Sequence, residues 1–165
     1  MFDALFTTTT EYKKLSHALS GKGACALFGL PASGRAQVYA ALCRQLDKPL
    51  CIVTPGEAEA TRFAADLNTL GIPAAVFPAR DYVLRPIEGT AREYEYRRLA
   101  VLGELVGGRL RAVAVPAEAL TQFTTPKEDF CANTRTLHAG DTLLRDDLLA
   151  ALFGAGYTRR AQVDG

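Results

Sequence analysis

Residues 29–36, with the sequence GLPASGRA, constrain the fold of this chain more than any other segment. Gly29 and Gly34 have the spacing of the two glycines in a phosphate-binding loop, G-x-x-x-x-G-K-[ST]. The apolar residues 24–28 come directly before this loop, and a helical pattern follows it. A strand, a glycine loop and a helix in this order form the first unit of many α/β folds that bind phosphates. We therefore expect such a unit near the start of the chain.

The side chains that give this kind of loop its chemistry are replaced here. In a working loop the lysine contacts the β- and γ-phosphates, and the hydroxyl residue holds Mg²⁺. Arg35 stands at the lysine position and Ala36 at the hydroxyl position. Ala36 has no ligand atom, and the planar guanidinium of Arg35 does not substitute for a compact ammonium. We interpret Gly29, Ser33, Gly34, Arg35 and Ala36 as a degenerate phosphate loop.

Nucleotide hydrolysis also needs an acidic residue after an apolar strand, where it organises Mg²⁺ and water. The apolar residues 111–115 run into Pro116, Ala117 and Glu118, so no aspartate stands at that place. Glu118 is interpreted as a residue in the first turn of a helix. The sequence thus predicts no catalytic residue. Arg35 is interpreted as a solvated side chain at a helix start, with an anion contact as the alternative.

Short apolar runs alternate with helical patterns over residues 1–126. Strands are expected at residues 24–28, 50–53, 74–77 and 111–115. Helices are expected at residues 10–19, with Thr9 or Thr10 as the cap, and at residues 34–46, 60–70 and 90–106. The apolar residues expected on the inward faces are Val38, Ala41, Leu42 and Leu46 in the second helix and Ala60, Phe63, Ala64, Leu67 and Leu70 in the third. In the last helix, the residues expected to face inward are Tyr96, Leu99, Leu102 and Val106. The alternation predicts an α/β fold with a parallel sheet covered by helices on both faces.

A domain boundary is expected at residues 126 and 127, where threonines and a proline interrupt the pattern. Residues 127–165 are interpreted as the first part of a small α/β sub-domain that is truncated. Strands are expected at residues 134–137 and 157–163. Residues 141–144 lead into the helix between them, which carries Asp146 and Asp147 in its first turn and ends at Gly154 or Gly156.

Composition excludes several classes of function. The chain has 19 basic and 18 acidic residues and a net charge of +1, which leaves no broad positive surface for nucleic acid. The two histidines, His17 and His138, lie far apart in sequence, so no metal site is predicted. The four cysteines form no C-x-x-C pair, and Cys25 and Cys51 are expected to be buried, reduced thiols. A signal peptide and an apolar run of about 20 residues are both missing, so we expect a cytoplasmic protein without membrane contact.

Charges of alternating sign cluster near residue 95. The residues are Arg92, Glu93, Glu95, Arg97 and Arg98. They are interpreted as a solvated helix face with i,i+4 pairs such as Glu93 with Arg97. An interaction surface is the alternative interpretation.

Three further segments, together with the loop, suggest a family. They are residues 77–105 (FPARDYVLRPIEGTAREYEYRRLAVLGEL), 111–126 (RAVAVPAEALTQFTTP) and 137–165 (LHAGDTLLRDDLLAALFGAGYTRRAQVDG). In their order and spacing they resemble the N-terminal, UvrB-like module of the bacterial transcription-repair coupling factors (Mfd), over roughly residues 20–165. UvrB itself is a poorer match because it keeps an intact loop, G-x-T-G-x-G-K-T. It also inserts a long aromatic hairpin that clamps DNA, whereas residues 77–90 are too short for it and carry only Tyr82.

The resemblance implies a function without catalysis. The first domain would be of the nucleotide-binding type with a decayed ATPase site, and the second sub-domain would dock on the excision-repair protein UvrA. The chain would act as an adaptor that helps recruit UvrA to RNA polymerase stalled at DNA damage and that regulates the full-length translocase. Its partners would be UvrA and the other domains of the factor, with no direct DNA binding. No cofactor is implied, because ATP serves motor domains that these residues lack.

The partner-binding candidates are Tyr157, Arg159 and Arg160, which could contact an acidic partner surface. An edge-strand role that discourages aggregation is the alternative. In the family this unit is followed by a G-x-F-x-x-R-G segment that the chain lacks, so the UvrA-docking surface is expected to be incomplete. The alternative function for the whole chain is a residual nucleotide-binding or NTPase domain of a UvrB-like or helicase-like protein.

Overall fold

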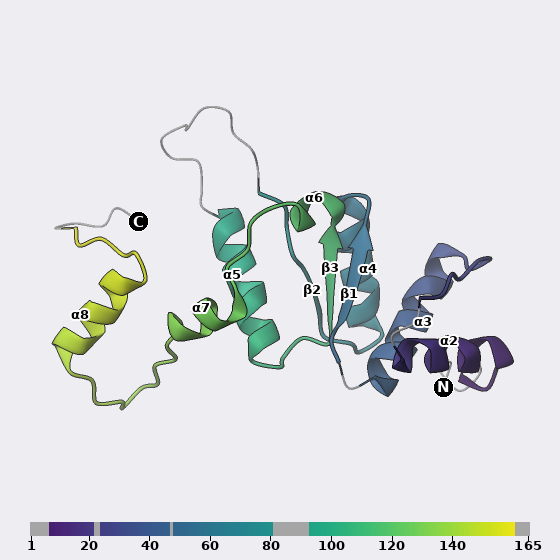
Figure 1. Ribbon diagram of the computed structural model, residues 1–165, viewed down its shortest axis with the longest axis horizontal. Helices are drawn as coiled ribbons and strands as arrows, with labels where there is room; N and C mark the ends of the chain where they lie inside the picture. Colours follow the sequence, from purple (N-terminus) through teal and green to yellow (C-terminus); the bar gives the residue numbers. More distant parts are fainter. Residues whose placement is uncertain (1–6, 22–23, 47, 81–92, 161–165) are drawn as a thin grey trace. The chain divides into compact units, whose positions relative to one another are not determined.

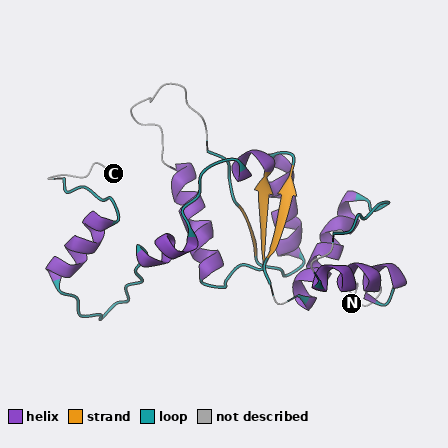
Figure 2. Cartoon of the chain, viewed as in Figure 1, coloured by secondary structure: helices purple, strands orange, loops and turns teal. Residues whose placement is uncertain are grey.

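The computed structural model describes residues 7–21, 24–46, 48–80 and 93–160, which belong to two compact units (Figure 1). Unit 1 spans Met1–Gln122 and unit 2 spans Phe123–Gly165. The division falls close to the boundary expected from the sequence. Helices occur in both units, whereas the strands among the described residues all lie in unit 1 (Figure 2).

A parallel sheet of three strands, in the order β1-β3-β2, forms the centre of unit 1. β1 (Leu50–Thr54) and β2 (Ala74–Val76) each pair with β3 (Ala112–Pro116). All five residues of β3 are buried, as is typical of a central parallel strand covered on both faces. The predicted α/β class and parallel sheet are confirmed.

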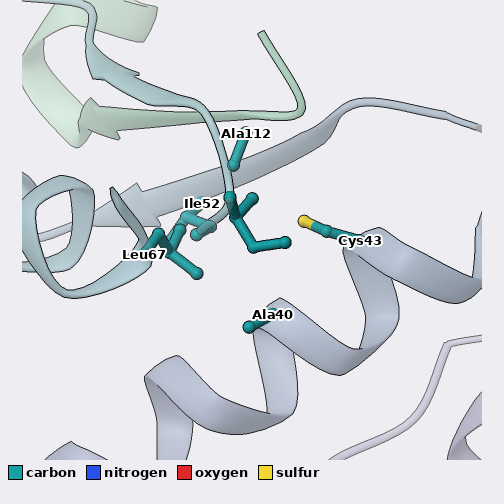
Figure 3. Packing of buried hydrophobic residues seen from close by; sticks show 6 residues of the cluster. Ala40, Cys43, Ile52, Leu67 and Ala112 are labelled. Carbon is teal, nitrogen blue, oxygen red and sulfur yellow. The ribbon is translucent and has the colours of Figure 1, made fainter. Parts of the chain in front are cut away.

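Helices α3 (Ala32–Gln45) and α4 (Glu57–Thr69) cover one face of the sheet. Their shared core cluster consists of Ala40, Cys43, Ile52, Leu67, Ile72 and Ala112 (Figure 3). Leu67 and Ala40 are fully buried in it. Nearer the start of α4, Ala60 and Ala64 lie against Ala114 of β3. Small residues at these positions let the helix approach the strand closely.

Helix α2 (Thr10–Ser20) packs on α3. The Thr9 hydroxyl accepts a hydrogen bond from the backbone N–H of Tyr12 at 3.2 Å, so the predicted cap is confirmed. The Tyr12 ring is buried, and its hydroxyl donates to Oε1 of Gln45 at 2.9 Å. The α3 residues packed in this cluster are Val38, Ala41 and Leu42, all predicted to face inward.

Helix α5 (Glu93–Val106) covers the opposite face of the sheet. Its Val101 packs in one cluster with Phe77 and with Val113 and Val115 of β3. The short helix α6 (Ala117–Leu120) follows β3 and adds Ala119 to the same cluster. Because side chains of β3 enter clusters on both faces, the predicted arrangement with helices on each side is confirmed.

The predicted inward face of α5 was wrong for three of its four residues. Tyr96, Leu99 and Val106 are 64%, 47% and 45% exposed, whereas Leu102 packs against the core as predicted. Arg98 and Val101 are buried instead, and the prediction had assigned Arg98 to the solvated face. An arginine can be buried when its stem packs and its guanidinium has partners.

Two polar side chains in unit 1 form hydrogen bonds with the backbone of a neighbouring helix or strand. The Asn68 side chain donates to the carbonyl of Ala74 at 2.8 Å and accepts from its N–H at 3.1 Å, which ties β2 to the end of α4. Nη2 of Arg111, just before β3, donates to the carbonyls of Cys43 and Leu46 at 2.7 and 2.6 Å. These carbonyls belong to the last turn of α3, where an arginine is a favourable cap.

The strand predicted at residues 24–28 is not formed. These residues are irregular and exposed, and Phe28 is 87% exposed. An apolar run becomes a strand only when a neighbouring strand supplies hydrogen bonds, and local sequence does not reveal that partner. Within the described residues no strand pairs with this segment, and the sheet ends at β1 on that side.

Unit 2 holds α7 (Lys127–Ala132) and α8 (Arg145–Gly154). As predicted, α8 carries Asp146 and Asp147 in its first turn and ends at Gly154. The strand expected at residues 134–137 is not formed, and residues 157–160 are irregular as well. The remainder of the second expected strand lies outside the described residues. No described residue of either helix is buried, so unit 2 shows no core of its own that would hold strands together.

Candidate functional site

The glycine loop begins with a turn that favours glycine. Gly29 has a φ of +81°, in the left-handed region that side chains disfavour. Pro31 then adopts a φ of −66° and precedes the first residue of α3, Ala32. The helix therefore begins before the second glycine, Gly34, and the segment is a tight turn followed directly by a helix.

In the first turn of α3, the backbone groups next to Gly34 form helical hydrogen bonds. The N–H of Arg35 donates to the Pro31 carbonyl at 3.1 Å. A Cβ atom on Gly34 would lie 3.3 Å from Cδ of Pro31, a tight contact that would require the proline ring to shift slightly. Packing against Pro31 thus gives Gly34 a structural role that is independent of phosphate.

Arg35 and Ser33 are exposed and line a cavity of about 200 Å³ beside α4. The α4 residues that share this lining are Glu59, Arg62, Phe63 and Asp66. Two carboxylates therefore face the same space as the two arginines, and they repel an anion that enters it. Ala36 lies on the other side of the helix, 3% exposed, where it packs in the interior. The structure gives Arg35 a neighbourhood of mixed charge and places no hydroxyl at position 36.

Glu118 lies in the first turn of α6 and is exposed, as the sequence predicted. β3 ends at Pro116, which takes the N-cap position of this short helix. The chain therefore passes from the central strand straight into a helix.

Tyr157, Arg159 and Arg160 are all exposed, and Tyr157 is 66% exposed. The N–H of Tyr157 donates to the carbonyl of Leu152 at 3.0 Å, which closes the end of α8. These residues belong to unit 2, whereas the glycine loop belongs to unit 1.

The charged face of α5 is only partly as predicted. Nη2 of Arg97 and Oε1 of Glu93 form the expected i,i+4 pair at 2.5 Å. Arg98, assigned to the same solvated face, is instead 3% exposed. Arg92, Tyr82 and the rest of residues 81–92 lie outside the described residues.

A buried polar network is the feature that the sequence did not reveal. The backbone N–H of Arg80 donates to Oε1 of Gln122 at 2.7 Å, and Nε2 of Gln122 donates back to the Arg80 carbonyl at 3.1 Å. Nη1 of Arg98 donates to the same Gln122 oxygen at 3.2 Å. Gln122 is itself buried. No local sequence pattern predicts that Gln122, which follows α6, contacts Arg98, which lies on α5.

The cysteines differ from expectation. Cys25 and Cys51 are exposed free thiols, whereas Cys43 is buried in the sheet-facing side of α3. Burial raises the pKa of the Cys43 thiol, against smaller opposing effects of Arg111 and Arg44. Although Cys51 is exposed, desolvation by the neighbouring protein atoms raises the pKa of its thiol. Cys25 was expected to be buried within a strand, and it is exposed because that strand is not formed.

Among the described residues, no three His, Cys, Asp or Glu side chains gather as metal ligands would. In the same part of the chain, none of the helices has the length and apolar character to cross a bilayer.

Comparison with known proteins gives one informative match. No protein-family model matches the chain, and no solved structure matches it. Over 139 residues it is 26% identical to the transcription-repair-coupling factor of Bacillus subtilis (strain 168). The match supports a weak relationship to transcription-repair coupling factor. It covers 83% of this chain but only 12% of that protein, so the chain corresponds to a small part of its relative.

Proposed function

We propose that this chain is a non-catalytic adaptor part of a transcription-repair coupling factor. In this role it would help recruit UvrA to RNA polymerase stalled at DNA damage and would regulate the motor of the longer protein. The observation that carries the proposal is the match along 83% of the chain to a known coupling factor. The match spans only 12% of the relative, so the activity of the whole relative is not carried over to this chain.

The geometry around the glycine loop supports the non-catalytic part of the proposal. Ala36 is buried and has no side-chain oxygen for Mg²⁺, and Arg35 shares its cavity with Glu59 and Asp66. We infer that this loop has lost nucleotide binding and now serves to start α3. Two observations support the competing function, a residual nucleotide-binding domain. Gly29 forms a left-handed turn, and no side chain among the described residues caps the start of α3. The backbone N–H groups at such a helix start can bind an anion.

A thermal-shift titration with Mg-ATP separates the two functions. A ligand at 100 times its Kd raises the free energy of unfolding by about 2.7 kcal/mol. The adaptor proposal expects no shift of the unfolding midpoint at millimolar Mg-ATP. A saturable shift that Arg35→Ala abolishes would instead establish nucleotide binding at the loop, provided that Arg97→Ala, at an exposed arginine outside this cavity, leaves the shift in place.

The adaptor function itself is tested with purified UvrA. We propose that Tyr157, Arg159 and Arg160 contribute to the contact, because they are exposed together after α8. Arg159→Glu combined with Arg160→Glu should weaken UvrA binding, measured by biolayer interferometry. Arg135→Glu, at another exposed arginine of the same unit, is the control. Equal binding by both charge-reversal variants would remove these two arginines from the interface. Because the docking surface of this chain is expected to be incomplete, the adaptor function would be contradicted by a lack of UvrA binding in the longer protein that contains these residues.

A further inference from the structure

A groove of about 490 Å³ lies between α2 and α3 and shares no lining residue with the cavity beside Arg35. Its volume falls within the range of small-molecule sites. The polar residues that line it include Lys13, Ser16, His17 and Ser20 from α2, with Arg44 and Gln45 from α3. The four α2 residues follow one helical face, at positions i, i+3, i+4 and i+7.

The charged side chains among the described residues that line this groove are of one sign. Lys13 and Arg44 approach it from different helices, and the imidazole of His17 adds a hydrogen-bond donor. None of the described lining residues is an Asp or a Glu. In contrast, the cavity beside Arg35 includes Glu59 and Asp66. An anion is therefore attracted to the α2–α3 groove more strongly than to the glycine loop.

The groove is also held in a defined shape. The Arg44 guanidinium donates to the carbonyl of Leu70, and the hydroxyl of Tyr12 is fixed by Oε1 of Gln45. The Ser20 hydroxyl donates to the Ser16 carbonyl at 2.8 Å. Side chains that are already ordered lose less conformational entropy when a ligand binds.

We propose that the groove between α2 and α3 binds a small anion that carries several phosphate groups. Lys13 and His17 lie one helical turn apart, about 5–6 Å, and Arg44 faces them from α3. Donors spread over this distance suit a chain of phosphates better than a single one. This site is independent of the adaptor function and of the loop at residues 29–36.

Isothermal titration of the whole chain with tripolyphosphate tests the proposal, with sulfate as the single-anion comparison. Saturable binding of tripolyphosphate is expected, and sulfate should bind much more weakly. Lys13→Ala and His17→Ala should each weaken binding by about tenfold, the loss of one good polar contact to an anion. The matched control is Lys14→Ala, since Lys14 is an exposed neighbour on the same helix that does not line the groove.

A second readout needs no substitution. Lysine acetylation by an N-hydroxysuccinimide ester, followed by mass spectrometry, should show that tripolyphosphate protects Lys13 but not Lys14. Equal protection of both lysines, equal affinity for sulfate, or equal losses from Lys13→Ala and Lys14→Ala would overturn the proposal. Binding that Arg35→Ala abolishes would place the anion at the glycine loop instead. Binding of a single-stranded oligonucleotide without any binding of tripolyphosphate would also overturn it.

Discussion

The guanidinium carbon of Arg98 lies 4.1 Å from the centroid of the Phe77 ring, in the interior of unit 1. Nη1 of the same arginine donates to the Pro78 carbonyl at 2.8 Å and to Gln122 at 3.2 Å. Phe77 follows β2, Arg98 lies on α5, and Gln122 follows α6. One side chain therefore joins three segments that are distant in sequence, and it closes the α5 face of the sheet.

Replacement of this arginine should destabilise the protein strongly. Arg98→Ala removes a desolvated cation–π contact and leaves Gln122 and the Pro78 carbonyl with one donor fewer, so we expect a loss of about 3 kcal/mol. The free energy of unfolding is measured by urea denaturation. Arg97→Ala is the control, because its pair with Glu93 is 60% exposed on the arginine side and such pairs contribute about 0.5 kcal/mol. Similar losses for the two variants would show that Arg98 is not buried in solution.

The α3–α4 core offers a second test at Leu67, which is fully buried. Leu67→Ala should cost about 2–5 kcal/mol, because a cavity remains between α4 and the sheet. Leu120→Ala is the matched control, since Leu120 is 56% exposed and its truncation should change stability by less than about 0.5 kcal/mol. Both values come from the same urea titrations. A Leu67→Ala loss below about 1 kcal/mol would argue that α4 does not pack on the sheet as described.

Sequence patterns were reliable where neighbours along the chain decide the structure. The cap at Thr9, the apolar face of α4 and the three paired strands all follow from local spacing. Sequence patterns failed where a contact with a residue distant in sequence determines the structure. Residues 24–28 are apolar enough for a strand but lack a neighbouring strand within the described residues, and Arg98 is buried only because Phe77 and Gln122 meet it there.

The candidate site shows the same contrast between features set by local sequence and features set by distant contacts. The spacing of Gly29 and Gly34 was sufficient to locate a turn at the start of α3, and the left-handed φ of Gly29 agrees with it. The sequence did not show that Glu59 and Asp66 share the cavity with Arg35, because this depends on how α3 and α4 pack. Lys13 and Arg44 meet for a similar reason, through the contact of α2 with α3.

The buried thiol of Cys43 predicts a pH dependence of stability. Its pKa is raised in the folded state, so the unfolded chain loses this proton at lower pH than the folded protein does. The contribution to stability is therefore complete below the thiol pKa of the unfolded chain and is lost as the pH rises through the folded value. In urea titrations between pH 7 and pH 10, wild type should lose more stability than Cys43→Ala, whose other titrating groups are the same. Cys131→Ala, which removes an exposed thiol, should follow wild type. Parallel curves for wild type and Cys43→Ala would contradict the burial of this side chain.

Restoring the phosphate-loop residues should not restore hydrolysis. Arg35→Lys with Ala36→Thr recreates the G-x-x-x-x-G-K-T pattern, but position 36 is 3% exposed and a larger side chain there should cost about 1–3 kcal/mol through overpacking. Glu59 and Asp66 would still face the cavity, and the chain after β3 still reads Pro116, Ala117, Glu118 without an aspartate. We expect no phosphate release above background in a coupled assay with Mg-ATP. Arg35→Lys alone is the control that leaves the core intact, and it should keep wild-type stability without gaining activity. Measurable turnover by the double variant would show that the loop retains the geometry of a nucleotide site, and the non-catalytic assignment would then have to be abandoned.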